Sequence, residues 1–167
     1  MQKFSDHCEL PASAERVAEA IMSTEYLEYR YKTEGVSHFE LTVTQDDGDG
    51  FAYRLRRSIA IGNRVPRIVR NLVGEALIMI QEGEWERDGD DYLGHFHLAE
   101  ERFSGGVDVE VRLESADPDI CRLSFEGKLQ VNVPLVGRQL EKLMVEKVSD
   151  SFTESIEAIE EYLESRS

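Results

Sequence analysis

The sequence predicts an α+β two-layer domain, in which a long C-terminal helix covers one face of an antiparallel sheet of about six to seven strands. Three observations lead to this fold class. Runs of alternating apolar and polar residues, separated by short turn sequences, fill most of residues 38–133. Two short helical segments follow the first strand, and an apolar residue recurs at every fourth position towards the C-terminus. No linker-like break interrupts this pattern, so residues 1–167 are expected to form a single domain.

The first elements are a strand and two short helices. Residues 2–10 predict a strand whose alternation places Asp6 on the same face as the apolar residues. The stretch LPASAERVAEAIMS predicts a helix, with Ser13 as its N-terminal cap. Residues 24–35 predict a second short helix, which Gly35 is expected to end.

The middle of the chain predicts antiparallel strands joined by hairpins. Residues 51–61 follow the turn sequence QDDGDG and place their odd-numbered apolar residues on one face. A regular strand points Arg57 inward as well, whereas a bulge at RRS turns it outward. In residues 76–85 the apolar residues change from even to odd positions, so a bulge is expected near Gly83. Further alternating runs at 92–98, 107–113 and 123–133 complete the sheet.

The last segment, from about residue 136 to residue 164, predicts a surface helix with one buried side. Its apolar stripe consists of Leu140, Leu143, Met144, Val148, Phe152, Ile156, Ile159 and Leu163. The face assigned to solvent consists of Glu141, Lys142, Glu146, Glu157, Glu160 and Glu164.

Composition narrows the class of partner. The net charge of −15 and the sequence pI of about 4.6 argue against nucleic acid, because a polyanion would be repelled. Cys8 and Cys121 form no zinc or redox motif and are expected to be buried, reduced thiols. The chain shows neither a signal-peptide pattern nor an apolar run of about 18–20 residues, which predicts a cytoplasmic protein. A monomer or a homodimer is expected.

Two segments carry a family resemblance. The opening LPASAERVAEAIMSTEYLEY, the closing VNVPLVGRQLEKLMVEKV and the order of elements resemble the START-like, or SRPBCC, superfamily over essentially the whole chain. That superfamily has the helix-grip fold of the birch pollen allergen. VPRIVRNLVG before a Trp-containing strand and VPLVG before the last helix are similar to a bacterial, mainly actinobacterial branch without an assigned function. These are scaffold motifs, so they name no reaction.

The resemblance implies a curved sheet wrapped around the C-terminal helix, with an apolar cavity between the sheet and this helix. Lipid-transfer proteins, polyketide cyclases, plant hormone receptors and co-chaperones share this superfamily. Our main hypothesis is therefore the binding of a small hydrophobic or amphipathic ligand, such as a lipid or a polyketide-like compound; the alternative is a solid core in the same place. The candidate ligand-binding residues are Tyr53, Arg57, Val69, Trp85, Tyr92, Phe96, Leu140, Met144, Val148 and Phe152.

A basic segment interrupts the acidic chain. Residues 51–74 contain six arginines and no Asp or Glu. These arginines either neutralise acidic neighbours and face solvent, or belong to an apolar flap over the cavity mouth that receives an anionic group. Contact with a membrane surface is a third interpretation, which the negative charge elsewhere does not favour.

Metal binding and catalysis have little support in the sequence. His95 and His97 share a strand face opposite the apolar one and have no third ligand at a matching spacing, so neither a metal nor another cofactor is expected. No catalytic motif is present, and catalytic residues cannot be named. An enzyme of cyclase or aromatase type would depend on Tyr53, Tyr92, Arg57 and Asp6. A further alternative is an interaction module whose acidic surface binds a basic partner.

Overall fold

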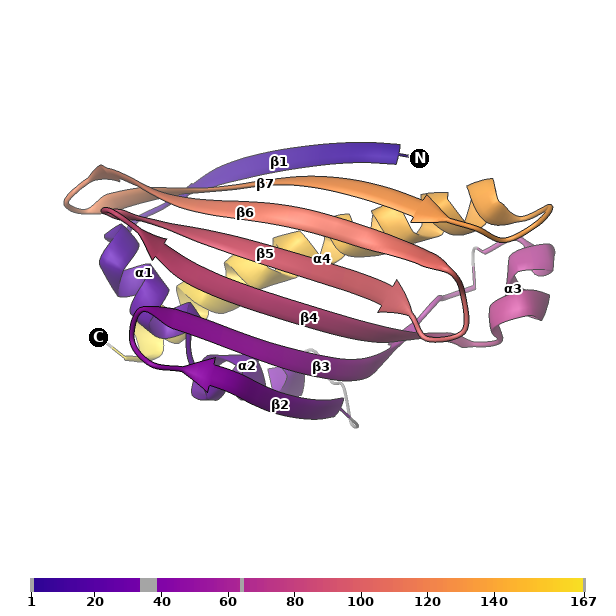
Figure 1. Ribbon diagram of the computed structural model, residues 1–167, viewed down its shortest axis with the longest axis horizontal. Coiled ribbons are helices and arrows are strands. Elements are labelled where there is room, and N and C mark those ends of the chain that lie inside the picture. Colours follow the sequence, from indigo (N-terminus) through magenta and orange to yellow (C-terminus); the bar gives the residue numbers. More distant parts are fainter. Residues whose placement is uncertain (1, 34–38, 64, 167) are drawn as a thin grey trace.

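In the computed structural model, the chain forms one seven-stranded sheet and four helices (Figure 1). The structure describes residues 2–33, 39–63 and 65–166. The strands are β1 (Gln2–Leu10), β2 (Phe39–Asp46), β3 (Gly50–Ala60), β4 (Ala76–Asp88), β5 (Asp91–Glu100), β6 (Gly105–Asp117) and β7 (Ile120–Val131). The helices are α1 (Ala14–Ile21), α2 (Thr24–Thr33), α3 (Arg67–Val73) and α4 (Gly137–Ser165).

The sheet is antiparallel throughout, with the strand order β1-β7-β6-β5-β4-β3-β2. Successive strands from β2 to β7 are neighbours, and β1 joins the far edge beside β7. Short hairpins join these successive strands, except that residues 61–75, which include α3, connect β3 to β4. Helix α4 runs along one face of the curved sheet, α1 and α2 lie at one of its ends, and α3 lies at the other (Figure 1). The predicted α+β helix-grip architecture is confirmed.

Strand β3 is regular, so its odd-numbered residues all face the helix layer. Phe51, Tyr53 and Leu55 are buried there, and so is Arg57, which is 5% exposed. Pairing with β4 continues without interruption past Arg57, opposite Met79, which excludes the alternative of a bulge at RRS.

Strand β4 differs from the sequence-based expectation. Its pairing with β3 and β5 is continuous through Gly83, so the bulge expected there is absent. Odd-numbered residues such as Met79 point inward along the whole strand, while Ile78 and Ile80 lie on the outer face. The assignment failed because β4 carries apolar residues on both faces, and alternation identifies a buried face only when the other face is polar.

The helices agree with the sequence except at particular residues. The Ser13 side chain accepts a hydrogen bond from the Arg16 amide and caps α1. Pro66 precedes α3 as its N-cap. Glu141 was assigned to solvent but is buried, because its Oε1 accepts a hydrogen bond from the Val131 amide, which joins the start of α4 to the end of β7. Gly35, the expected stop of α2, lies outside the described residues.

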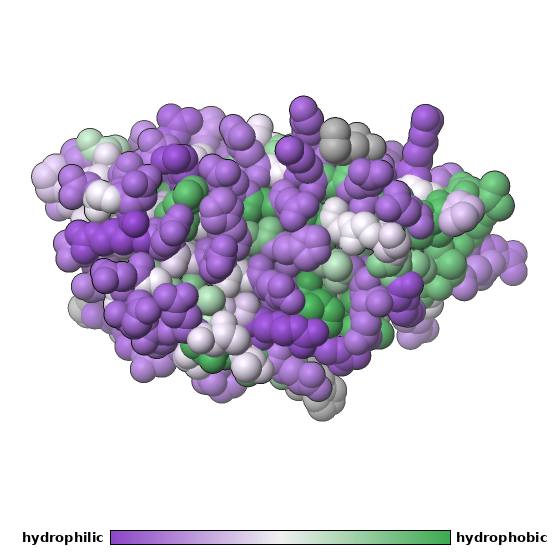
Figure 2. Space-filling view, viewed as in Figure 1, coloured by the Kyte–Doolittle hydropathy of each residue, from purple (hydrophilic) through white to green (hydrophobic). Residues whose placement is uncertain are grey.

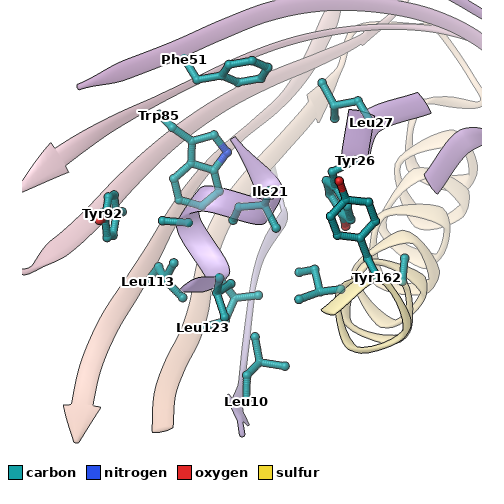
Figure 3. Packing of buried hydrophobic residues seen from close by; sticks show 14 of the residues in the cluster. Leu10, Ile21, Tyr26, Leu27, Phe51, Trp85, Tyr92, Leu113, Leu123 and Tyr162 are labelled. Carbon is teal, nitrogen blue, oxygen red and sulfur yellow. The ribbon is translucent and has the colours of Figure 1, made fainter. Parts of the chain in front are cut away.

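The buried apolar residues form two separate clusters. The first cluster joins α1, α2 and the C-terminal part of α4 to the sheet, and includes Leu27, Trp85 and Tyr162 (Figure 3). The second cluster joins α3 and the N-terminal part of α4 to the sheet, and includes Val69 and Leu140. The space between the two clusters lies beneath the middle of α4.

Candidate functional site

The middle of α4 is packed less closely than its two ends. Leu140, Leu143 and Met144 are buried near the start of the helix, and Ala158, Ile159 and Tyr162 near its end. Between them, every residue from 145 to 157 remains at least partly exposed, including apolar residues of the predicted stripe. Helix α4 makes its main contacts with β7, β1, α1 and α2. The strands β3–β6 are therefore covered less closely.

A cavity of about 160 Å³ occupies this space. Its wall comes from α1, α2, α4 and strands β3–β7, which are the inner face of the sheet and the helices laid against it. Apolar and aromatic side chains make up most of the wall, as is usual for small-molecule sites. The apolar lining residues are Ile21, Tyr26, Leu27, Tyr53, Ile59, Leu77, Met79, Trp85, Phe96, Leu98, Val109, Val111, Leu123, Phe125, Met144, Val148, Phe152 and Ile159.

An aromatic group covers the part of the wall formed by β3, β4 and β5. The rings of Trp85 and Phe96 meet edge-to-face at 5.6 Å, and Tyr53 lies 6.5 Å from Phe96. Gly83 makes this possible, because a Cβ atom there would lie 2.7 Å from the Tyr53 ring and 2.8 Å from the Phe96 ring. Gly94 has the same role beneath Phe96 and Trp85. The glycine at position 83 thus makes room for aromatic rings in a regular strand.

Polar side chains gather on the wall between α2, β3 and α4. Arg30 donates hydrogen bonds to the Tyr31 hydroxyl at 3.0 Å and to the Ser151 hydroxyl at 2.7 Å. The guanidinium carbons of Arg30 and Arg57 lie 4.9 and 4.6 Å from the centroid of the Tyr31 ring. Both arginines line the cavity although they are buried, so this wall carries two positive charges beside an electron-rich ring.

Tyr53 completes the polar part of the wall. Its hydroxyl accepts a hydrogen bond of 2.6 Å from Gln81 Nε2. Burial raises the pKa of Tyr53 well above its ordinary value, and this effect exceeds the opposing influence of the nearby arginines and of Gln81. Tyr53 is therefore a neutral hydrogen-bonding group at physiological pH and a poor proton acceptor.

Seven of the ten candidate ligand-binding residues lie on the cavity wall: Tyr53, Arg57, Trp85, Phe96, Met144, Val148 and Phe152. The other three lie elsewhere. Val69 and Leu140 are fully buried in the second cluster. Tyr92 belongs to the first cluster, where it pairs with Leu113 across β5 and β6. In the sequence, these three residues have the same spacing as the residues that line the cavity. In the structure, however, they lie where the helices pack closely against the sheet.

Sequence reasoning missed several residues of the wall. Lys147, Ser151 and Ser155 line the cavity from α4, and Arg30 lines it from α2. Lys147, Ser151 and Ser155 recur every four residues directly beside the apolar stripe of α4. The two serines at the edge of this stripe are a sequence signal that could have identified polar groups on the cavity wall. Arg30 had no such signal, because α2 is polar on most of its surface and the side chain is placed by its contact with α4.

The basic segment does not act as one unit. Arg56 forms a bidentate pair with Glu101 on the outer face, and Arg54 lies 3.8 Å from Glu82 there. These two neutralise acidic neighbours, whereas Arg57 faces the cavity. Arg67 and Arg70 lie on α3, where Arg70 Nη2 donates a hydrogen bond to the Gly62 carbonyl. Arg64 lies outside the described residues.

Asp6 lies far from Arg57. It is exposed on β1, at one edge of the sheet, while Arg57 belongs to β3 near the opposite edge. Alternation assigned both residues to the inner face but carried no information on strand order.

His95 and His97 lie on the outer face of the sheet, in an open polar trough of about 1090 Å³ that crosses all the strands. His97 Nδ1 lies 2.8 Å from the Asp108 carboxylate. Within the described part of the chain, no three His, Cys, Asp or Glu side chains are grouped closely enough to hold a metal ion.

Comparison with known proteins places the chain in a family. Residues 7–163 match a family model described as "Protein of unknown function (DUF2505)". The chain belongs to DUF2505. No curated protein matches the DUF2505 chain.

Solved structures share the fold of this DUF2505 protein at low sequence identity. TTHA0849 from Thermus thermophilus is 19% identical with a TM-score of 0.63, and the alignment covers 99% of each chain. The Zhui aromatase/cyclase from a Streptomyces species is 12% identical with a TM-score of 0.63, covering 99% of this chain and 94% of that one. A START superfamily protein from Mycobacterium smegmatis is 13% identical with a TM-score of 0.56, covering 99% of each chain. The predicted START-like fold is thus confirmed.

Across the described residues of the DUF2505 chain, we find no helix that combines the length and the apolar character needed to cross a membrane.

Proposed function

We propose that this DUF2505 protein binds a small apolar or amphipathic molecule in the cavity beneath α4. The observation that carries the proposal is the gap between two well-packed clusters, lined by apolar side chains that stay partly accessible on the inner face of the sheet. A core without a ligand role is expected to be close-packed, with few voids larger than a water molecule. An apolar cavity of this size is a ready site for an apolar guest.

The cavity volume sets the size of the ligand. A cavity of about 160 Å³ accommodates a molecule on the order of one aromatic ring without rearrangement. Larger ligands require side chains of the wall to move. Met144 and the half-buried Phe152 are suited to this, because Met is flexible and the middle of α4 is not closely packed.

The polar wall supports an amphipathic ligand bound in one orientation. Arg30, Arg57 and Gln81 offer hydrogen-bond donors on one side, while Trp85 and Phe96 offer apolar surface. Among the described lining residues there is no His, Cys, Asp or Glu to act as a general base, and Tyr53 is held neutral. The wall therefore supports binding better than the cyclase chemistry carried out by one of the structural relatives.

Trp85 provides a direct test. It is the only tryptophan of the chain and lies on the cavity wall, so its fluorescence reports on the cavity. Titration with toluene, naphthalene and N-phenyl-1-naphthylamine is expected to change Trp85 emission and to raise Tm, because a ligand that binds only the folded state stabilises it. Native mass spectrometry of freshly purified protein tests for a co-purifying ligand.

A cavity-filling variant separates this site from other apolar surfaces. Val109→Phe adds a ring at the cavity wall, and is expected to weaken binding of these probes by at least about tenfold, the equivalent of roughly 1.4 kcal/mol. Ile80→Phe makes a comparable change on the outer face of the same sheet and should leave binding unchanged. Absence of binding for all three probes, or equal binding by the two variants, would refute the proposal.

A further inference from the structure

One end of the molecule carries exposed apolar side chains. Ile68 and Leu72 on α3 are 51% and 39% exposed, and Leu135, in the turn between β7 and α4, is 96% exposed. Apolar surface gathers at the end where α3 and this turn lie (Figures 1 and 2). We call these three residues the apolar tip. They are the large apolar residues that stand out as exposed in the described part of the chain.

Leu135 is held outward by an unusual backbone conformation. Its φ of 70° makes it the one described residue other than glycine with a positive φ. This left-handed region is rare for large side chains, whereas glycine and asparagine adopt it readily. A leucine that is both strained and almost fully exposed has no packing role, which points to a contact with something outside the chain.

Helix α3, which carries two of the three residues of the apolar tip, is packed firmly against the rest of the molecule. Its Val69 and Val73 are buried in the second core cluster beside Leu140. Its last carbonyl, at Val73, accepts a hydrogen bond of 3.0 Å from Arg102 Nη1. Ile68 and Leu72 are therefore exposed because they lie on the outward side of α3, whose other side is packed against the core.

The charge around the tip is opposite to that of the whole chain. Arg67 and Arg138 are exposed beside the apolar residues, and Arg70 is half-buried. The segments 61–74 and 132–140 contain no Asp or Glu, although the chain as a whole has a net charge of −15. Exposed apolar side chains flanked by two exposed arginines are complementary to a surface that is apolar beneath and negatively charged outside.

From these observations we propose that the apolar tip docks end-on to an anionic membrane surface. The three side chains insert among the lipid headgroups, and the arginines contact the phosphate groups. The exposed apolar area of three side chains is on the order of a few hundred Å². A stable protein interface buries about 800 Å² on each partner, so the tip is too small to hold a folded partner by itself.

The negative charge of the remaining chain does not oppose this orientation. Helix α4 has 29 residues and spans about 43 Å, and its C-terminal half, rich in glutamate, lies at the opposite end from α3 (Figure 1). The Debye length at physiological ionic strength is about 8 Å. A membrane that meets the tip therefore interacts with the arginines while the distant carboxylates are screened.

Vesicle flotation of the full chain tests the proposal. Wild-type protein should float with vesicles of phosphatidylcholine mixed with phosphatidylglycerol, and more weakly with phosphatidylcholine alone. Leu135→Asn keeps a residue that accepts a positive φ and should lower partitioning about tenfold, because an apolar side chain is no longer buried. Replacing Arg67 and Arg138 by glutamine should lower it about fivefold for each charge removed.

Matched controls separate the tip from general effects. Leu135→Met keeps an apolar side chain and should bind like wild type. Arg122→Gln removes an exposed arginine at the β6–β7 hairpin, at the other end of the molecule, and should also bind like wild type. Unchanged Tm in each variant shows that folding is retained. The proposal is overturned if wild type does not float, if Leu135→Asn floats equally well, or if the tip instead forms a dimer in sedimentation equilibrium without binding vesicles.

Discussion

At the scale of single residues, the cavity is distinguished from an ordinary core by a few buried polar side chains. Arg30 and Arg57 both approach the ring of Tyr31, and Gln81 is hydrogen-bonded to Tyr53. Buried charges are tolerated where hydrogen bonds and aromatic faces replace water. These residues therefore mark one side of the cavity wall as polar and give a bound molecule a preferred orientation.

The two cysteines give a prediction at the same scale. Burial, with the nearby charges of Glu160 and Asp6, raises the pKa of Cys8 to about 11. Burial, with a smaller effect of Cys8, raises the pKa of Cys121 to about 11. Below pH 9 the thiolate fraction is thus about a hundredfold lower than in the unfolded chain, whose thiols have the ordinary pKa of 9.0. At pH 8, Ellman's reagent should modify the native thiols at least about a hundredfold more slowly than those of the urea-unfolded chain.

The sign of the pH dependence follows from the raised pKa values. The protonated thiols are favoured by the fold, so their contribution to stability is complete below about pH 9 and is lost as the pH rises through 11. Cys8→Ser leaves Cys121 alone and reports on the more deeply buried thiol. Native and unfolded rates that are equal would contradict the burial of these groups.

At the scale of elements, a buried carboxylate joins β4, β5 and α3. Glu100 is 3% exposed and accepts hydrogen bonds of 2.7 Å from the amides of Ile78 and Arg102. Its Oε2 lies 2.6 Å from Arg102 Nη2, and the same guanidinium donates to the carbonyls of Val73 and Ala76. Burial by itself would raise the pKa of Glu100, but the hydrogen bonds from Arg102 and Ile78 outweigh it and lower the pKa.

Glu100→Gln should destabilise the protein by about 1–3 kcal/mol, because buried donors lose their charged acceptor. The adjacent Glu101→Gln is the matched control. Its pair with Arg56 lies at the surface, where solvent screens ion pairs and they contribute little to stability. Urea denaturation of both variants measures the difference, and an equal loss in the two would contradict the role assigned to Glu100.

The Glu100 pair also predicts an acid dependence. Because its pKa is lowered in the fold, its stabilising contribution is present above the ordinary value of about 4.5 and is lost as the pH falls through the folded pKa. The stability difference between wild type and Glu100→Gln should therefore shrink below pH 4.5. A difference that stays constant to pH 3 would show that the carboxylate acts only through its shape.

At the scale of the whole molecule, the apolar tip and the C-terminal half of α4 differ in charge. Arg67 and Arg138 are exposed at the apolar tip, while exposed glutamates such as Glu157, Glu160 and Glu164 lie towards the other end of α4. If the tip docks as proposed, partitioning onto anionic vesicles should pass through a maximum as salt is raised. At about 0.01 M the Debye length of roughly 30 Å lets the whole negative chain repel the surface, and near 1 M the attraction of the arginines is screened as well.

Flotation over this range of salt measures the dependence, with uncharged phosphatidylcholine vesicles as the reference. The Arg67/Arg138 double glutamine variant should lose the maximum. A steady fall in binding from the lowest salt upward would show that the distant carboxylates do not repel the membrane, even when salt does not screen them.

Local sequence patterns were sufficient to predict the order of elements, the antiparallel sheet and most of the residues on its inner face. Where a strand alternates cleanly, as β3 does, period two places even a charged residue such as Arg57 correctly. The apolar stripe of α4 likewise identified the face that meets the sheet. These features depend on local periodicity, which neighbouring residues in the chain carry.

Which inward residues face a cavity depends on how the helices and the sheet pack against each other. Met144 and Leu140 are one helical turn apart on the same stripe and both belong to the second cluster, yet Met144 lines the cavity and Leu140 does not. Arg30 lies on the cavity wall because α2 contacts α4. Asp6 does not, because the strand order places β1 at the edge of the sheet. A cavity is the space left between two curved, packed layers, and the periodicity of an inward residue is the same whether it meets a neighbour or a gap.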